Sequence, residues 1–185
     1  KYKDYIFQTY IPNKGDWRVL VLNGSVLGVM HRSAKPGSIV NNISQGGMAA
    51  EESNTAILEQ LKATSLRATA VFGLEFASID IIQDERTKQY YILEIGTTAD
   101  WQEFQNVTGI DVAANICSYL KNAQTRHKET YLAVKDTFDQ AFKTNQNKAF
   151  HYYSRMYLWG RDIQYHHRLL ELREEYIGLS AKESA

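Results

Sequence analysis

The sequence predicts an α+β fold: a mostly antiparallel sheet with flanking helices, followed by a long helical extension. Runs of β-forming residues, separated by turn residues, occupy residues 5–32 and 74–95. Apolar residues recur at helical spacing over residues 51–70, and again after the second run. The extension contains no proline. We therefore expect two domains, residues 1–120 with the sheet and residues 121–185 with the helices.

The composition is that of an ordinary globular protein. Of the 185 residues, 44% are hydrophobic and 23% are charged, and the 21 basic and 21 acidic residues cancel. Without a basic stripe, no nucleic-acid partner is expected, and no apolar run approaches the ~20 residues that cross a bilayer. A single cysteine and the lack of a signal peptide predict a reducing, cytoplasmic location. The first residue is not Met, so we expect the chain to be a piece of a longer protein.

A β-hairpin is the clearest local prediction. Residues 17–32 form two apolar runs on either side of Asn23 and Gly24, and this dipeptide is the strongest short hairpin signal. A turn there brings together the outer strand ends, where Arg18 and Arg32 stand. Two adjacent guanidinium groups suit a phosphate or a carboxylate, although a solvated sheet edge explains them as well.

Strand-forming residues 5–11 precede the hairpin, and a loop rich in glycine and asparagine, residues 33–47, follows it. Loops carried by rigid strands often bear functional groups. The Gly-Gly pair of this loop permits a positive φ and a close approach to the backbone. Apolar spacing then predicts a helix from residue 51 to about residue 70, closed by Gly73.

Two apolar strands that each contain one acid lie at the centre of the predicted sheet. Asp80 belongs to residues 77–82 and Glu94 to residues 89–95, and the short charged linker between them predicts an antiparallel pair. The two carboxylates then point to the same face. Such carboxylates suit magnesium held jointly with substrate phosphates. The alternative is that each acid meets an arginine or backbone donors and only shapes the sheet.

The C-terminal part is predicted to form long helices, broken near residues 144–147 and at Gly160 and Gly178. Before it, Trp101 and Phe104 are expected to cover the end of the sheet. Many aromatic residues in the helices predict internal packing or a contact between copies of the chain. The histidines there lack the pattern of a zinc site, so packing is the preferred interpretation.

Several segments, taken in order, resemble the C-terminal half of an ATP-grasp ligase of the RimK-like group. Any one of them is a weak signal, but their order and spacing make the resemblance specific. The resemblance extends from about residue 5 to residue 120. Its segments are residues 8–11, 15–18, 31–35, 42–47, 79–82, 93–96 and 108–113.

The resemblance implies that this part of the chain binds ATP and magnesium. The segment containing Gln8, Tyr10 and Ile11 matches the one that lines the adenine, where backbone groups read the base. The residue matching Asp16 lies at the sugar side of the nucleotide. The resemblance also implies a partner within the same fold, an N-terminal half that carries phosphate-binding lysines, so the chain by itself is not expected to catalyse.

The remaining implied roles concern the phosphates and the metal. Arg18 and Arg32 match residues that face phosphate and acyl-phosphate, and Asn42 matches one that supports this pocket. Asp80 and Glu94 match the magnesium ligands. The family reaction joins a carboxylate to an amine through an acyl-phosphate and consumes ATP, so a small-molecule or peptide substrate is implied, with an amino acid or peptide preferred.

Three departures from the family pattern leave a second function open. Thr9 replaces an acid at the adenine, Val40 replaces a base, and Gly96 replaces an asparagine that is normally the third metal ligand. Asp100 is a candidate substitute for that ligand. The alternative function is a degenerate ATP-grasp module that binds nucleotide, or acts as a scaffold, without catalysis.

Overall fold

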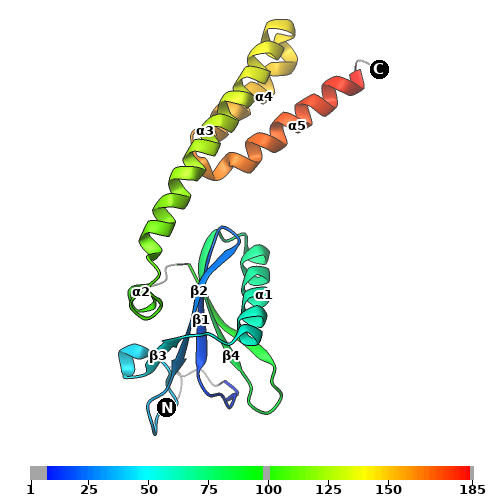
Figure 1. The fold of residues 1–185 in the computed structure, drawn as a ribbon. Helices are drawn as coiled ribbons and strands as arrows, with labels where there is room; N and C mark the ends of the chain where they lie inside the picture. Colours follow the sequence, from blue (N-terminus) through cyan, green and yellow to red (C-terminus); the bar gives the residue numbers. More distant parts are fainter. Residues whose placement is uncertain (1–7, 98–100, 184–185) are drawn as a thin grey trace, which may run out of the picture. The chain divides into compact units, whose positions relative to one another are not determined.

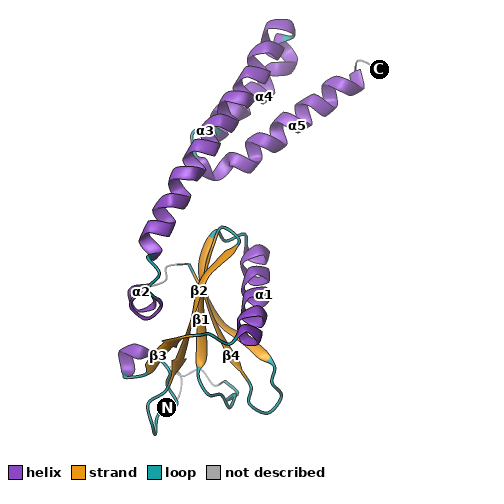
Figure 2. Cartoon of the chain, viewed as in Figure 1, coloured by secondary structure: helices purple, strands orange, loops and turns teal. Residues whose placement is uncertain are grey.

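The computed structural model describes residues 8–97 and 101–183. The chain divides into two compact units, residues 1–114 and residues 115–185. Figure 1 labels most of their elements and Figure 2 separates strands from helices. The first unit contains β1 (Asp16–Leu22), β2 (Ser25–Ser33), η1 (Ile43–Gln45), β3 (Met48–Glu51), α1 (Thr55–Phe72), β4 (Phe76–Gln83), β5 (Tyr90–Gly96) and α2 (Gln102–Thr108). The helices that follow are α3 (Val112–Thr144), α4 (Gln146–Trp159), η2 (Ile163–Tyr165) and α5 (His166–Glu183).

Within the described residues the sheet has five strands in the order β3-β2-β1-β4-β5, and every neighbouring pair is antiparallel. The predicted α+β class and antiparallel sheet are therefore confirmed. The predicted hairpin is β1 and β2, and its turn residues Asn23 and Gly24 have φ values of 50° and 68°. Positive φ at both positions is what a two-residue hairpin turn requires. The predicted strand pair is β4 and β5.

One face of the sheet packs against α1, which runs along it in Figure 1. Leu61 of α1 is completely buried in this core with Val19, Ile79 and Ile81 of the central strands. Because side chains alternate along a strand, the residues between these apolar positions point to the opposite face. That opposite face carries the charged residues of the site.

The helix α1 begins at Thr55, four residues later than predicted. Asn54 caps it by accepting hydrogen bonds from the amides of Ala56 and Ile57, at 3.0 and 3.3 Å. Glu51, where the helix was predicted to begin, instead ends β3, a short edge strand paired with β2. The predicted C-terminal signal is confirmed, since Gly73 ends the helix with φ 63°.

The helix α2 covers part of the face opposite α1. Phe104 is completely buried there, and its ring lies beside Gly28 of β2, where a Cβ would come within 3.1 Å of Phe104 Cζ. Trp101 contacts Phe76 edge to face, with ring centroids 5.9 Å apart. The expected covering role of Trp101 and Phe104 is confirmed by these contacts.

Residues 8–11 do not form the predicted strand. They lack regular secondary structure, and the rest of that predicted strand, residues 5–7, lies outside the described residues. Pro12, which follows this segment, contacts the linker of the β4–β5 pair, because the Glu85 amide donates to the Pro12 carbonyl at 2.9 Å. High β propensity alone does not make a strand where no partner strand is available.

The C-terminal unit is built from three long helices. Phe138 of α3 and Met156 of α4 are completely buried, together with Val134, Leu169 and Leu172. Predicted breaks near residues 144–147 and at Gly160 are confirmed, whereas Gly178 lies inside α5, where a single glycine is tolerated.

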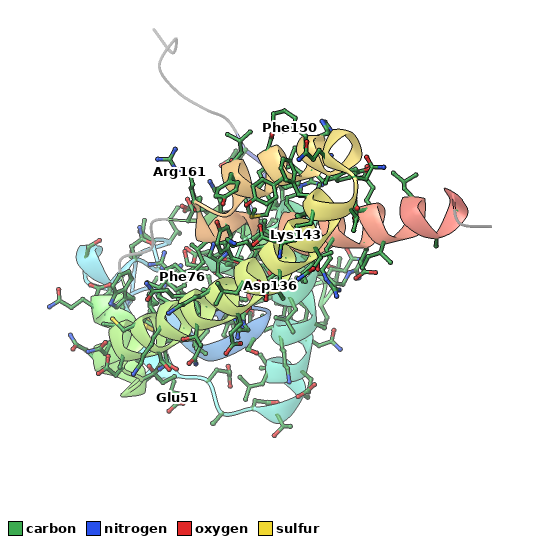
Figure 3. All side chains as sticks on the ribbon, turned by 90° about the horizontal axis from the view of Figure 1, so that it is seen from above. Glu51, Phe76, Asp136, Lys143, Phe150 and Arg161 are labelled. Carbon is green, nitrogen blue, oxygen red and sulfur yellow. The ribbon has the colours of Figure 1, made fainter. Side chains whose placement is uncertain are left out.

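Aromatic residues surround this helical core, as the sequence indicated. Those packed against it are Tyr131, Tyr152, Tyr153, Trp159 and Tyr176. Phe150, labelled in Figure 3, is 63% exposed, and contact between copies of the chain through such residues stays a prediction. None of the described helices is long and apolar enough to span a membrane.

Candidate functional site

Four charged side chains meet on the sheet face opposite α1. Asp16 and Arg18 lie two residues apart on β1 and therefore project to the same side. Strand pairing places Arg32 of β2 opposite Asp16, and Asp80 of β4 opposite Arg18. The register of three neighbouring strands thus assembles two acids and two bases that are distant in sequence.

Asp80 is the centre of this charged cluster. Arg18 Nε donates to Asp80 Oδ1 at 2.9 Å, and Arg18 Nη2 donates to Asp80 Oδ2 at 2.8 Å. Arg32 Nη2 also donates to Asp80 Oδ2, at 2.8 Å, and the Arg32 guanidinium additionally donates to both carboxylate oxygens of Asp16. For Asp80, the structure therefore shows the alternative arrangement, in which the acid is paired with arginines.

Burial makes these charges interact strongly. Asp16, Arg32 and Asp80 are 3%, 5% and 7% exposed. Burial by itself raises the pKa of Asp80, but the hydrogen bonds and charges of Arg18 and Arg32 outweigh it and lower that pKa. Burial likewise opposes the charge of Arg32, yet Asp16 and Asp80 raise its pKa. Asp80 and Arg32 are therefore charged at neutral pH.

Glu94 lies directly across from Asp80 on β5. The register of this pair shifts between Asp80 and Ile81, and the shift leaves Glu94 on the face of the charged cluster. The expectation that Asp80 and Glu94 point to the same face is confirmed by this pairing. Unlike Asp80, Glu94 is exposed, so its carboxylate is available to a ligand.

Asp80 and Glu94 fit a magnesium ion that is shared with substrate phosphates. Among the described residues, no three His, Cys, Asp or Glu side chains gather closely enough to hold a metal by themselves. Magnesium bound with a nucleotide needs only one or two carboxylates, because phosphates and water complete its shell. Asp100, the candidate substitute ligand, lies outside the described residues.

A polar pocket of about 200 Å³ adjoins one end of the cluster. Its lining includes Gly15 and Ser33, the chain neighbours of the paired residues Asp16 and Arg32. Tyr10 is the predicted adenine residue that lines this pocket. The other lining residues are Asn13, Lys14, Ala34, Ser38, Ile39 and Asn41. Of these, Asn13 helps to shape the pocket by accepting a hydrogen bond from the Gly15 amide at 3.0 Å.

The other predicted residues lie outside the hydrogen-bonded cluster. Gln8 is exposed, and the Ile11 carbonyl accepts a hydrogen bond from the Asn13 amide group at 2.8 Å. Asn42 precedes η1 with an exposed side chain, and its carbonyl accepts from the Gly47 amide at 3.1 Å. The Gly-Gly pair is explained by this loop itself, since a Cβ on Gly47 would come within 2.4 Å of the Asn41 carbonyl oxygen.

Sequence reasoning did not identify the pairing of Asp16 with Arg32. The alternation of Asp16 and Arg18 along one strand was a usable signal, because it places both charges on one face. Ser78 lies two residues before Asp80 and therefore on the same face, but the sequence did not single it out. A hydroxyl in an otherwise apolar strand gives no distinct sequence signal.

The fold of the sheet unit is that of ATP-grasp ligases. It resembles the structure of the ATP-grasp ligase PsnB complexed with a phosphomimetic variant of minimal precursor, Mg and ADP, with a TM-score of 0.50 at 18% identity. That alignment covers 62% of this chain and 34% of PsnB. The model of the RimK-like ATP-grasp domain family matches residues 2–120, and the chain belongs to this family. The resemblance inferred from short segments is thereby confirmed.

Curated relatives match the same part of the chain. The glutamate–LysW ligase ArgX of Sulfolobus acidocaldarius is 35% identical over 125 residues, which are 67% of this chain and 43% of that protein. A probable alpha-L-glutamate ligase of Aeromonas salmonicida is 32% identical over 123 residues, covering 65% and 40% respectively. The chain thus spans about two fifths of the length of these relatives.

Proposed function

We propose that these residues form the magnesium and phosphate side of a ligase that joins a carboxylate to an amine at the expense of ATP. The observation that carries the proposal is the bridging of Asp80 by Arg18 and Arg32, with Glu94 opposite on the paired strand. Two guanidinium groups and two carboxylates on one face match the charges of a nucleotide and its magnesium ion. Family membership supports the same reaction class.

The proposed reaction has two steps. The substrate carboxylate attacks the terminal phosphorus of ATP, forming an acyl-phosphate and releasing ADP. The amine then attacks the acyl carbon, phosphate leaves, and the nitrogen loses a proton. Charge develops on the transferred phosphoryl oxygens in the first step and on the leaving phosphate in the second, and Arg18 and Arg32 would stabilise it.

Ligand binding is proposed to exchange the partners within the cluster. Asp80 and Glu94 would hold magnesium, which when bound neutralises phosphate charge. Arg18 and Arg32, which now donate to Asp80, would turn their donors to the phosphate oxygens. Asp16 keeps Arg32 in place, since it binds the same guanidinium. Tyr10 and its pocket would take the adenine and sugar end, as would the neighbouring Gln8 and Ile11, and Asn42 would support the phosphate loop.

The test is trapping of the acyl-phosphate with hydroxylamine. The full-length protein is supplied with magnesium, ATP and glutamate, the acid named in the relatives, or with a peptide carboxylate. Carboxylate-dependent ADP release and a hydroxamate product are expected, and Glu94→Gln should abolish both. Glu59→Gln, which neutralises an exposed acid on α1, is the control and should leave both unchanged. A folded protein that binds no magnesium nucleotide in calorimetry contradicts the proposal.

A second function is favoured by one observation, the glycine at position 96. Together with an Asp80 whose two oxygens are already bonded to arginines, it suits a module that binds nucleotide without catalysis. Magnesium-dependent ADP binding with no hydroxamate from any amino acid or peptide carboxylate supports this alternative. The remaining predictions, a cytoplasmic location and homo-oligomers formed through the C-terminal helices, are checked by fractionation and analytical ultracentrifugation.

A further inference from the structure

Two side-chain oxygen atoms lie close to the position that a Cβ of residue 96 would occupy. Strand pairing places Ser78 of β4 opposite Gly96, just as Asp80 lies opposite Glu94. A Cβ built on Gly96 would lie 2.8 Å from Ser78 Oγ and 3.6 Å from Glu94 Oε1. The Ser78 hydroxyl therefore occupies the space that any side chain at position 96 requires.

The oxygen atom of this hydroxyl can coordinate a cation. Ser78 is 6% exposed, and its hydroxyl donates to the Gly96 carbonyl at the long distance of 3.5 Å. A serine oxygen that donates one proton keeps two lone pairs for a cation. An amide oxygen of an asparagine stands about 2.4 Å from its own Cβ, given ordinary bond lengths. Ser78 Oγ therefore lies almost as close to the Cβ position of residue 96 as the amide oxygen of an asparagine at that position would lie.

We propose that Ser78 Oγ is the third protein oxygen of the magnesium site that Asp80 and Glu94 form, and that position 96 is glycine to leave room for it. The inference rests on the proposed function, because it assigns a ligand to the same ion. In this assignment the neutral oxygen ligand comes from Ser78 of β4, in place of a side chain at position 96 of β5. Three oxygens from two paired strands, completed by phosphates and water, suit the six-coordinate shell of magnesium.

The test compares metals of different softness on the full-length protein with ADP. Manganese, which replaces magnesium and is visible by electron paramagnetic resonance, measures affinity for the hard ion. Ser78→Ala should weaken manganese binding about tenfold, the lower end of the effect of removing a group that supports a metal site. Ser78→Cys should weaken manganese binding and strengthen cadmium binding, because a thiolate prefers the softer ion.

Position 65 provides matched controls. Ser65 of α1 is fully buried on the other side of the sheet, so Ser65→Ala and Ser65→Cys alter a hidden hydroxyl away from the site and should leave both affinities unchanged. The double variant Ser78→Ala/Gly96→Asn should regain manganese affinity. Unchanged manganese and cadmium affinities in both Ser78 variants, with the wild type binding normally, overturn this inference and leave the proposed function standing. A wild type that binds no manganese–ADP overturns both.

Discussion

Arg18 holds Asp80 through two parallel hydrogen bonds, from Nε to Oδ1 at 2.9 Å and from Nη2 to Oδ2 at 2.8 Å. The planar guanidinium matches the planar carboxylate, and this geometry positions a charge more tightly than a single contact does. The same fork can bind two oxygens of a phosphate. The pair therefore connects the stability of the sheet with the proposed chemistry.

Arg18→Lys keeps the positive charge but removes the two parallel hydrogen-bond donors of the guanidinium. We expect the affinity of the full-length protein for magnesium and a non-hydrolysable ATP analogue to fall about tenfold or more, since a charge-assisted hydrogen bond contributes roughly 1.5–3 kcal/mol. Isothermal titration calorimetry measures the loss. The matched control is Arg67→Lys, which changes an exposed arginine on α1, on the other side of the sheet. Equal affinities for the two variants would show that Arg18 does not contact the nucleotide.

Asp80→Asn should destabilise the folded protein at pH 7 by about 3 kcal/mol, because it leaves two partly buried arginines without their shared anion. The folded-state pKa of Asp80 is lowered. Its stabilising contribution is therefore complete above the unfolded pKa of about 3.9, and it is lost as the pH falls through the lower, folded pKa. The free-energy gap between wild type and variant should accordingly shrink below about pH 4.

Urea unfolding at a series of pH values measures this gap. Asp136→Asn is the control, because Asp136 is exposed on α3 and is labelled in Figure 3. It should change the free energy of unfolding by less than about 0.5 kcal/mol, as surface substitutions usually do. A gap for Asp80→Asn that stays constant from pH 7 to pH 3 would mean that the arginines do not depend on its charge.

Gly28→Ala and Gly178→Ala should have opposite effects on stability. At Gly28 a Cβ would come within 2.5 Å of Ile110 Cδ1, so overpacking should cost about 1–3 kcal/mol. At Gly178, inside α5, no atom lies within 4 Å of the new Cβ, and alanine should stabilise the helix by about 0.5–1 kcal/mol. Thermal unfolding compares the two. Stabilisation by Gly28→Ala would contradict the packing of α2 on β2, and destabilisation by Gly178→Ala would contradict the open surroundings of that position.

Phe138→Ala should loosen the C-terminal helices. Phe138 is fully buried against Tyr152 and Tyr176, so its truncation should cost about 3–5 kcal/mol. Hydrogen exchange in α3 and α5, read by mass spectrometry, measures the loss locally. Phe150→Ala removes an equally large but exposed ring and should leave exchange unchanged. If the two variants exchange alike, the helical core is not where the structure has it.

Local signals in the sequence were enough to predict much of the sheet. The Asn23–Gly24 turn specifies its own hairpin, because the positive φ values that it favours also set the strand register. The β4–β5 pair followed from two apolar runs and a short linker. The edge strand β3 was missed because its residues, Met48–Glu51, have little β propensity and pair only because β2 offers a free edge.

The sequence by itself determined the antiparallel hairpins, the helical C-terminal part and the family, because these depend on periodicity, turn chemistry and the order of short segments. Only the tertiary structure decided what the charges do. Arg32 and Asp80 are separated by 48 positions in the chain, and their contact exists because β1 lies between their strands in one particular register. The separate register of β4 and β5 sets Ser78 against Gly96, a contact that depends on side-chain alternation across two strands rather than on any signal within either one.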